Sequence, residues 1–373
     1  MRILHFSRDY TPHDHRFLVA MAASGHETLF LRLENGAGAS DDRPLPAGVT
    51  TIPWAGGRRP VTWQDGPRLL LSLRKVLAEY KPDLIQAGPI QRCAFLAALA
   101  GYCPLIAFSW GYDLLHDAAR GPSWSWATRF TLKRSAAFVG DCATIRDLAE
   151  TAGMDPLRIV TFPWGADLQR FTPGDRRQNT VRERKGWGPE CFVLLSTRNW
   201  APLYGIEDLA EAFVSAAGQR PELCLLMLGG GPLSGRIKEI FTAAGMIDRV
   251  HFPGQVSQAA LPEYYRAADL YISTSHSDGT SISLLEALAS GTPVLLTDIP
   301  GNREWIEEPG REGWLFPDGQ APALTAAILN ALDRRSELPA MGRAARGLAE
   351  QRGDWEKNFP HLFKAWEIAL AQC

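Results

Sequence analysis

Two carboxylates that stand eight residues apart, Asp278 and Glu286, are the side chains of this chain best placed for chemistry on a sugar or a nucleotide. The apolar run 269–274 before them predicts a buried strand, and residues 283–290 predict a helix that ends at Gly291. One carboxylate therefore follows the strand in its exit loop, and the other lies on the helix. Unpaired backbone N–H groups at the start of that helix could hold a diphosphate, while Glu286 accepts hydrogen bonds from sugar hydroxyl groups. The pattern predicts a nucleotide-sugar site.

The segment from Asp278 to Glu286 resembles the E-x7-E motif of the retaining GT-B glycosyltransferases usually called family four, with Asp in place of the first Glu. Its sub-pattern, D-G-x-S-x-S-L-L-E, is familiar among bacterial members. Further signatures follow in the order of that family, between about residue 160 and residue 310. They are the phosphate-binding segment 196–209, the strand and turn 226–232, the base-side loop 251–256 and the helix 261–269. Jointly they are specific, and the chain is identified as a member of a subgroup with a D-x7-E motif.

The resemblance implies a role for several side chains around the donor. The counterpart of Glu286 binds the ribose hydroxyl groups of the nucleotide, since a carboxylate can accept both of their hydrogen bonds. Asp278 takes the position of a carboxylate that lies beside the donor sugar, and Arg198 matches an arginine whose planar fork suits phosphate. The partner lysine of the family falls where this chain has Tyr204. The other residues implied in donor binding are Gly279, Thr280, Ser281, Gly230 and Val256.

The same resemblance implies a mechanism that retains the anomeric configuration. In the family, retention is usually explained by front-face attack, in which the leaving diphosphate helps to take the acceptor proton. Charge then develops on phosphate, and Arg198 and helix-end N–H groups would stabilise it. We therefore expect catalysis by Asp278, Arg198 and Asp113, with a nucleoside-diphosphate sugar as co-substrate and neither a cofactor nor a metal ion.

Two segments of the first half are candidates for contacts with the sugar or the acceptor. Residues 108–113 resemble the segment in which many relatives place a His near the donor sugar, and Asp113 is predicted to make that contact. The alternative is an Asp that caps the next helix. His15 and Arg16 stand where relatives carry a Gly-Gly phosphate loop, and we expect them to meet the acceptor or the diphosphate. The His-Asp-His run 13–15 could suggest a metal, but we interpret it as a polar cleft loop.

Length and composition limit the class of protein to which the chain can belong. With 373 residues, of which 46% are hydrophobic, the chain predicts two globular domains. No apolar run reaches the roughly 18 residues of a membrane span, and Met1 and Arg2 lead directly into a strand without a signal-peptide pattern, so a cytoplasmic protein is expected. Six cysteines form no C-x-x-C pair, and we expect neither disulfides nor a zinc site. A net charge of −2 and the lack of a recognition motif argue against a nucleic-acid partner.

Basic residues concentrate in the first half of the chain. Residues 1–180 contain 21 Lys and Arg against 17 Asp and Glu, whereas residues 181–373 contain 18 against 24. Between residues 58 and 81, basic side chains interleave with Trp63 and the apolar run 69–73. A helix there could make peripheral contact with the anionic inner face of a membrane. The alternative is a helix whose basic residues face solvent.

Apolar strands alternate with helical segments in both halves, which predicts parallel α/β sheets. The predicted fold is GT-B, with two Rossmann-like domains that face each other across a cleft. An acceptor-side domain covers 1–172, a polar linker covers 173–187, and the nucleotide-sugar domain covers 188–352. As in the resembled family, the helical segment 355–373 is expected to pack back on the first domain. Ligands of such sheets bind at the carboxyl ends of the strands.

The sequence therefore predicts a retaining glycosyltransferase that moves a sugar from a nucleoside diphosphate to a glycan, a lipid-linked acceptor or a small molecule. Two alternatives are kept. A GT-B nucleotide-sugar epimerase or hydrolase would share the cleft but need no acceptor. A non-catalytic nucleotide-sugar-binding partner protein would fit the missing lysine at Tyr204 and the missing Gly-Gly loop.

Overall fold

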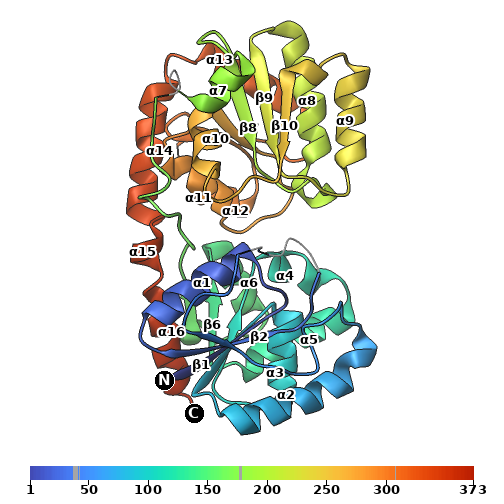
Figure 1. Cartoon of the computed structure of the whole chain (residues 1–373), viewed down its shortest axis with the longest axis vertical. Coiled ribbons are helices and arrows are strands. Elements are labelled where there is room, and N and C mark those ends of the chain that lie inside the picture. Colours follow the sequence, from blue (N-terminus) through green and yellow to red (C-terminus); the bar gives the residue numbers. More distant parts are fainter. Residues whose placement is uncertain (37–40, 42, 176–178, 307) are drawn as a thin grey trace. The chain divides into compact units, whose positions relative to one another are not determined.

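A computed structural model describes the chain from Met1 to Cys373 except for residues 37–40, 42, 176–178 and 307. The described chain forms two compact units (Figure 1). Unit 1 comprises Met1–Phe162 and Phe359–Cys373, and unit 2 comprises Pro163–Asn358. Each unit has its own parallel sheet covered by helices, so the predicted fold class of two parallel α/β domains is confirmed.

The boundary between the units differs from the predicted one. The sequence predicts that residues 163–172 end the first domain, but they belong to unit 2. The reason is a short backbone pairing, in which Ala166 N donates to Gly353 O (2.7 Å) and Trp355 N donates to Ala166 O (3.0 Å). This pairing holds the segment against the end of α14 (Leu338–Arg352). The chain accordingly re-enters unit 1 at Phe359.

Unit 1 contains a seven-stranded sheet in the order β3-β2-β1-β4-β5-β6-β7, with all neighbouring strands parallel. In chain order, β2 and β3 lie on one side of β1, and the next strand, β4, lies on its other side. The order therefore reverses between β1 and β4, and this place is the switch point of the sheet. The strands are β1 (Arg2–Ser7), β2 (Glu27–Arg32), β3 (Val49–Thr51), β4 (Leu84–Gly88), β5 (Leu105–Phe108), β6 (Ala137–Gly140) and β7 (Ile159–Thr161).

Helices cover both faces of this sheet. On one face α2, α3 and α5 pack side by side, and on the other face α1 and α16 meet the sheet through a shared polar network. A π-helical turn, Ile90–Ala94, leads from β4 into α3. The helices are α1 (Pro12–Ala23), α2 (Gly66–Tyr80), α3 (Phe95–Ala100), α4 (Tyr112–Leu115), α5 (Pro122–Arg134), α6 (Ala143–Thr151) and α16 (His361–Leu370), with 3-10 turns at Trp63–Asp65, Asp117–Ala119 and Pro156–Arg158.

The last helix is tied to the middle of the sheet of unit 1 by a buried polar network. Trp366 of α16 donates its indole N–H to Gln86 Oε1 at 3.1 Å, and the amide nitrogen of Gln86 lies 2.8 Å from His5 Nδ1. The other ring nitrogen of His5 lies 3.0 Å from Asp14 Oδ1. All four side chains are buried, and buried polar groups of this kind need such partners. The network explains why α16 packs on β4 to β7.

A disulfide joins Cys103, at the end of the turn after α3, to the terminal Cys373. This corrects the prediction that the chain has no disulfide. The two cysteines are 270 residues apart in sequence, and their Cα atoms are 6.2 Å apart because α16 returns the end of the chain to unit 1. Spacing along the sequence could not reveal such a pair. In the described chain the cysteines at positions 93, 191 and 224 are free thiols.

Unit 2 contains a six-stranded parallel sheet in the order β10-β9-β8-β11-β12-β13, whose switch point lies between β8 and β11. None of the helices in the described parts of the chain is long and apolar enough to cross a membrane. The strands are β8 (Phe192–Ser196), β9 (Leu223–Leu228), β10 (Val250–Gly254), β11 (Leu270–Ser273), β12 (Val294–Thr297) and β13 (Gly313–Phe316). The helices are α7 (Thr180–Lys185), α8 (Ile206–Gln219), α9 (Ser234–Ala243), α10 (Leu261–Ala267), α11 (Ile282–Ala289), α12 (Pro300–Arg303), α13 (Ala321–Asp333), α14 and α15 (Trp355–Asn358), with 3-10 turns at Pro202–Tyr204 and Ile247–Arg249.

The segment predicted as a polar linker contains a helix. Residues 176–178 of it lie outside the described residues, but Asn179 caps α7 by accepting hydrogen bonds from the backbone N–H groups of residues 181 and 182. Arg182 is buried, donates to Ala267 O at 2.7 Å and forms an ion pair with Asp269. A buried, paired arginine leaves no apolar period in the sequence, which is why the charge-rich composition conceals this helix.

Candidate active site

The residues predicted for the donor gather at the carboxyl edge of the sheet of unit 2, at its switch point. Arg198 lies in the loop that follows β8, Asp278 lies in the loop that follows β11, and Glu286 lies on α11. The two loops are adjacent because β8 and β11 pair, although Arg198 and Asp278 are 80 residues apart in sequence. Ligands of open parallel sheets bind at such a place. The topology therefore positions these three side chains where a ligand is expected.

Arg198 is the centre of the cluster. Its Nη2 donates to Asp278 Oδ2 at 2.6 Å, and its Nη1 donates to the hydroxyl oxygens of Ser281 at 2.6 Å and Ser283 at 3.1 Å. The guanidinium carbon lies 4.5 Å from the centre of the Tyr204 ring, over its face. Burial is the largest single influence and would lower the pKa of Arg198, but the charge of Asp278 and the nearby Tyr271, Tyr204 and Tyr265 together raise this pKa. The guanidinium therefore remains charged, with its fork held in one orientation.

Asp278 shares the partly closed environment of this arginine. Its side chain is 21% exposed, and burial raises the pKa of its carboxyl group, whereas the positive charge of Arg198 opposes that rise. The backbone of residues 278 and 279 packs directly against Gly301 of α12, where a Cβ atom would lie 2.6 Å from each of their carbonyl oxygens. The loop that carries Asp278 is thus backed by a helix.

Tyr204 does not supply the charge of the family's lysine, but its ring covers Arg198. The Tyr204 backbone oxygen accepts a hydrogen bond from Thr274 Oγ1 at 2.8 Å, so the turn before α8 is tied to the loop after β11. The next residue, Gly205, has a φ of +55°, and a Cβ atom there would collide with Thr274 O. Only glycine fits this turn.

Glu286 is held by a residue that sequence reasoning missed. Tyr265 of α10 is fully buried, and its hydroxyl donates to Glu286 Oε2 at 2.9 Å. The same hydroxyl lies 3.1 Å from Ser283 O and 3.3 Å from Thr197 Oγ1. Burial raises the pKa of Tyr265, with the charge of Glu286 adding to the effect, so the tyrosine remains a donor. The tyrosine lies in a predicted helix, but no sequence signal aims its hydroxyl at Glu286.

The other predicted donor residues line the same edge of the sheet. Ser281 is the residue before α11 and contacts Arg198, and Thr280 Oγ1 accepts a hydrogen bond from Trp305 Nε1 at 3.4 Å. Gly230 follows β9, and its carbonyl accepts from Trp200 N at 3.0 Å. Val256 follows β10 and is partly buried. Of the predicted set, Asp278, Ser281 and Tyr204 each contact Arg198, and Glu286 joins them through Ser283 and Tyr265.

Asp113 does not fit the predicted contact with a sugar. Its side chain is fully buried, and its carboxylate accepts hydrogen bonds from Ile90 N (3.1 Å), Ser109 Oγ (2.6 Å) and Leu114 N (3.0 Å). Burial raises the pKa of Asp113 to about 6, against the effect of these donors. Asp113 joins the π-helical turn after β4 to the first turn of α4, but it lies inside α4 and does not cap this helix, whose N-cap is Gly111, so the alternative of a helix cap does not fit either.

The loop after β1 has its own polar contacts. His15 Nδ1 lies 2.5 Å from the Tyr10 hydroxyl, and burial lowers the pKa of His15. Arg16 lies half-buried on α1, where relatives carry glycines. Asp14 points into the buried network with His5. The side chains of residues 13–15 therefore do not all point in the same direction. The contacts of His15 and Arg16 with an acceptor or a diphosphate stay predictions.

Comparison with known proteins identifies the family of the chain. The family described as glycosyl transferases group 1 matches residues 177–348, and the glycosyl transferase 4-like domain matches residues 12–165. The first match contains every residue of the Arg198 cluster. The chain belongs to the group 1 glycosyltransferases. Its resemblance to that family is therefore confirmed.

Relatives of this group 1 glycosyltransferase have several names. The chain is 32% identical over 236 residues to a D-inositol 3-phosphate glycosyltransferase of Geodermatophilus obscurus, which covers 61% of this chain and 51% of that protein. It is 25% identical over 350 residues to a GDP-mannose-dependent alpha-(1-6)-phosphatidylinositol monomannoside mannosyltransferase of Mycobacterium tuberculosis, with 88% and 86% covered. The chain thus spans about half the length of the first relative and most of the second.

Solved structures share the fold of this group 1 glycosyltransferase. Sucrose-phosphate synthase of Thermosynechococcus elongatus has a TM-score of 0.81 at 18% identity, over the whole of both chains. Anabaena HepE, solved in complex with UDP, has a TM-score of 0.76 at 18% identity, over 98% of this chain and all of the other. These matches confirm the GT-B fold.

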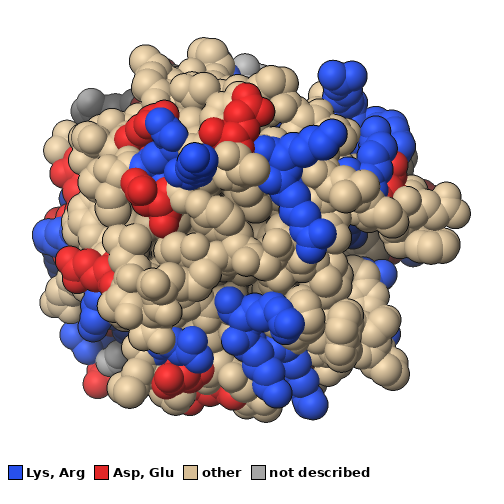
Figure 2. Space-filling model, turned by 90° about the horizontal axis from the view of Figure 1, so that it is seen from below, with Lys and Arg blue, Asp and Glu red and all other residues tan. Residues whose placement is uncertain are grey.

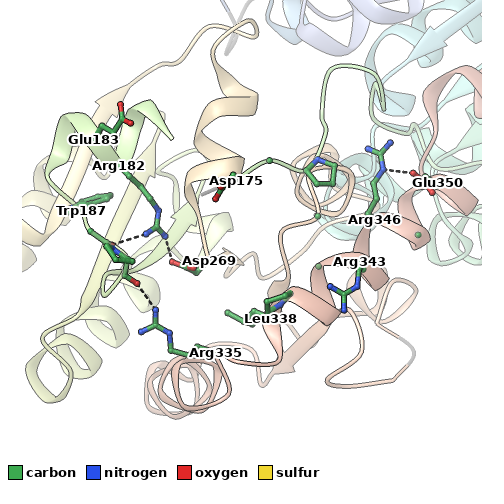
Figure 3. Close-up of a pocket in the computed structure, with 18 of the residues that line it drawn as sticks. Asp175, Arg182, Glu183, Trp187, Asp269, Arg335, Leu338, Arg343, Arg346 and Glu350 are labelled. Atoms are coloured by element: carbon green, nitrogen blue, oxygen red, sulfur yellow. Dashed lines mark hydrogen bonds and ion pairs between the residues drawn. The ribbon is translucent and has the colours of Figure 1, made fainter. Parts of the chain in front are cut away.

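The large groove of unit 2 lies at the opposite edge of its sheet (Figure 3). It has a volume of 1260 Å³, and its walls include residues that directly precede β8, β11 and β12, so it opens at the amino ends of these strands. The dashed contacts of Figure 3 include the pair of Arg182 with Asp269, and Arg335, which donates to Pro189 O at 2.9 Å. Two charge pairs lie within this groove, Arg182 with Asp269 and Arg346 with Glu350. It is separate from the cluster around Arg198.

Proposed function

We propose that the chain is a retaining glycosyltransferase that moves a sugar from a nucleoside-diphosphate sugar to an acceptor. The observation that carries the proposal is the contact of Arg198 with Asp278 and Ser281 at the switch point of unit 2, beside a carboxylate held by Tyr265. A guanidinium fork suits the diphosphate, and a fixed carboxylate suits the ribose. Family membership and the UDP complex of HepE support the same donor class.

Each group has a role in this reaction. Negative charge grows on the leaving diphosphate, and Arg198 stabilises it together with backbone N–H groups at the starts of α8 and α11. Asp278 contacts the donor sugar, and Glu286 binds the ribose hydroxyl groups. The leaving diphosphate helps to take the acceptor proton during front-face attack. No metal or cofactor is needed in this scheme, because protein groups supply the positive charge, so a chelator should leave turnover unchanged.

The acceptor is a glycan, a lipid-linked sugar or a small molecule. The names of two relatives favour a phosphorylated polyol or a phosphoinositide glycolipid. An acceptor of that kind carries a phosphate ester beside its hydroxyl groups. The first unit of the chain is the proposed acceptor side.

We also propose that the protein works in the cytoplasm, in peripheral contact with the inner face of the membrane. Within the segment 58–81, Trp63 is 86% exposed and Leu71 is 62% exposed, and Arg68 and Lys75 are exposed on the same helix α2 as Leu71. Figure 2 views the molecule from the side where α2 lies in Figure 1 and shows Lys and Arg side chains gathered over part of this face. Such a surface attracts anionic lipid, and exposed tryptophan suits the headgroup layer.

The test of the proposed activity is acceptor-dependent turnover. Nucleotide release from UDP, GDP and ADP sugars is measured with and without acceptors, and the anomeric proton of the product is assigned by NMR. The expected result is release that requires an acceptor, with the anomeric configuration of the donor retained. Steady release without any acceptor would instead indicate an epimerase or hydrolase, and donor binding without turnover would indicate a non-catalytic partner protein.

A further inference from the structure

Unit 1 has two arginines at its own switch point, between β1 and β4. Arg8 comes directly after β1, which ends at Ser7, and Arg92 lies in the π-helical turn that follows β4. Ligands of open parallel sheets bind where the strand order reverses, and in unit 2 the matching place holds Arg198. Neither Arg8 nor Arg92 belongs to a motif of the sequence.

A single buried carboxylate, Glu34, lies between these arginines. Arg8 Nε donates to Glu34 Oε1, and Arg92 Nη1 lies 3.9 Å from the same oxygen. The second oxygen, Oε2, accepts a hydrogen bond from Val61 N at 2.9 Å. The Glu34 side chain is only 2% exposed. One carboxylate therefore faces two guanidinium groups, and one positive charge is left over.

Arg92 has few partners for its donors. In the part of the chain that the structure describes, its Nε is buried without a hydrogen-bond partner, and its approach to Glu34 is longer than a hydrogen bond. The side chain as a whole is 29% exposed, so a ligand can reach it from solvent. A buried donor without a partner is unfavourable, and such groups often mark functional positions, as do π-helical turns. Arg92 is thus poised to take an anionic acceptor group.

We propose that Arg8 and Arg92 form an anion subsite in unit 1 that binds a phosphate ester carried by the acceptor. This inference rests on the proposed glycosyl transfer, in which unit 1 is the acceptor side. Two guanidinium forks suit a phosphate ester, since it offers up to three free oxygens and more than one negative charge, whereas a carboxylate offers two oxygens and one charge. Glu34 keeps Arg8 oriented, and the hydroxyl of Tyr112 hydrogen-bonds with the same arginine. On binding of the phosphate ester, Arg92 gains more new contacts than Arg8 does.

Arg92 is the residue to change, because Arg8 also joins the exits of β1 and β2 through its pair with Glu34. Inorganic phosphate is the probe, titrated by calorimetry. The titration uses protein with Arg198→Ala, so that the phosphate-binding arginine of unit 2 is absent. Arg92→Ala is then added and should weaken phosphate binding roughly 10- to 100-fold, the range for a charge-assisted contact. Arg92→Lys should recover only part of the affinity.

Arg129→Ala is the matched control, because Arg129 is an exposed arginine of α5 in the same unit. Its phosphate affinity should equal that of the parent protein. Equal phosphate affinity with and without Arg92, or no saturable phosphate binding at all, would overturn the subsite.

Two competitors distinguish the source of the phosphate ester. Displacement of inorganic phosphate by soluble myo-inositol 1-phosphate supports a free polyol phosphate, and displacement by phosphatidylinositol in phosphatidylcholine vesicles supports a lipid headgroup. If neither compound displaces inorganic phosphate, and pure phosphatidylcholine vesicles do not displace it either, the proposed class of acceptor is wrong.

Kinetics separate this inference from the proposed function. During sugar transfer, phosphate should compete with the acceptor, and Arg92→Ala should raise that inhibition constant while the KM for the donor stays the same. If phosphate competes with the acceptor equally well in Arg92→Ala and in the parent protein, only the proposed subsite is contradicted. A protein that turns over no nucleotide sugar, but still binds phosphate through Arg92, would contradict the glycosyl transfer instead and leave the anion site standing.

Discussion

At the residue scale, the Arg198–Asp278 contact links the two ends of the candidate donor site. The arginine would bind the diphosphate, the aspartate would meet the sugar, and they lie 2.6 Å apart. A change at either residue therefore disturbs the other, since removing one partner leaves a poorly solvated charge behind. Effects of the two substitutions should not be additive.

Removing the guanidinium should cost the enzyme most of its transition-state stabilisation. Arg198→Ala should lower kcat/KM by tens-fold or more, because a charge-assisted hydrogen bond contributes roughly 1.5–3 kcal/mol. Arg198→Lys should rescue poorly, since the planar fork is lost. Tyr204→Phe is the matched control: it keeps the ring face over the arginine and should cost much less. Steady-state kinetics on all three variants check this, and a near-normal Arg198→Ala enzyme would contradict the assignment.

Tyr265 should act as a positioning residue for Glu286. Tyr265→Phe keeps the buried ring but removes the hydroxyl that donates to Glu286 Oε2, so we expect weaker nucleotide binding by roughly 3- to 10-fold, the value of one hydrogen bond. Tyr271→Phe is the control, because it removes a neighbouring buried hydroxyl that donates to Ser283 Oγ. Calorimetric titration with the donor nucleotide measures both. Equal affinities for the two variants would remove the positioning role.

The sequence predicts these side chains unequally well. Arg198, Asp278 and Glu286 are found because a motif records both residue type and spacing. The contact of Tyr265 with Glu286 is not predicted, because it depends on how α10 packs against α11. The burial of Asp113 is not predicted either, because a carboxylate buried among three donors leaves no pattern in the sequence. A role that depends on where a side chain points, rather than on its spacing in the sequence, can be assigned only from the structure.

At the element scale, the turn before α8 holds the phosphate side of the site in place. Gly205→Ala places a methyl group against Thr274 O at a positive φ, so it should destabilise the protein by more than the 1–2 kcal/mol typical of a left-handed residue alone, and it should weaken donor binding. Gly245→Ala is the matched control, since its φ is +66° and nothing lies near its Cβ position. Urea unfolding of both variants measures the difference, and equal losses would show that the close approach is unimportant.

Elements are predicted well where the apolar period is strong. The strands of both sheets follow from buried apolar runs, and the exit loops follow from glycine and polar clusters. Helix α7 is missed because only one of its two buried residues, Val181, is apolar and the other is Arg182, and the boundary at 163 is missed because a two-bond backbone pairing decides it. Hydrogen bonds between distant backbone segments have no signature in side-chain types.

At the scale of the whole molecule, the charge of unit 1 should decide where the protein resides. Arg68→Glu combined with Lys75→Glu should weaken binding to vesicles with anionic lipid by at least about tenfold, because each basic residue near such a surface contributes about 1 kcal/mol. Lys238→Glu, on an exposed position of α9 in unit 2, is the control. Co-sedimentation at rising salt measures this. Binding that ignores salt, lipid charge and the α2 substitutions would leave only a solvated basic face.

The return of the last helix to unit 1 was expected from the family resemblance, but two contacts that accompany it were beyond prediction from spacing. The return of α16 depends on Trp366 reaching Gln86 inside unit 1, and the disulfide depends on that return. Both link residues that are more than 250 positions apart: 280 for the hydrogen bond and 270 for the disulfide. The parallel α/β character of both sheets, by contrast, follows from the α/β alternation that the sequence displays.

Binding of a nucleotide sugar at the switch point of unit 2 is measured by calorimetric titration of UDP, GDP and ADP sugars into the wild-type chain and into Glu286→Gln. We predict that one base binds with saturation, that at 100-fold over Kd it stabilises the wild-type protein by roughly 2.7 kcal/mol, and that Glu286→Gln binds it at least about tenfold more weakly without unfolding. Unchanged affinity in Glu286→Gln, or no binding of the UDP, GDP or ADP sugars, would contradict nucleotide-sugar binding at this switch point.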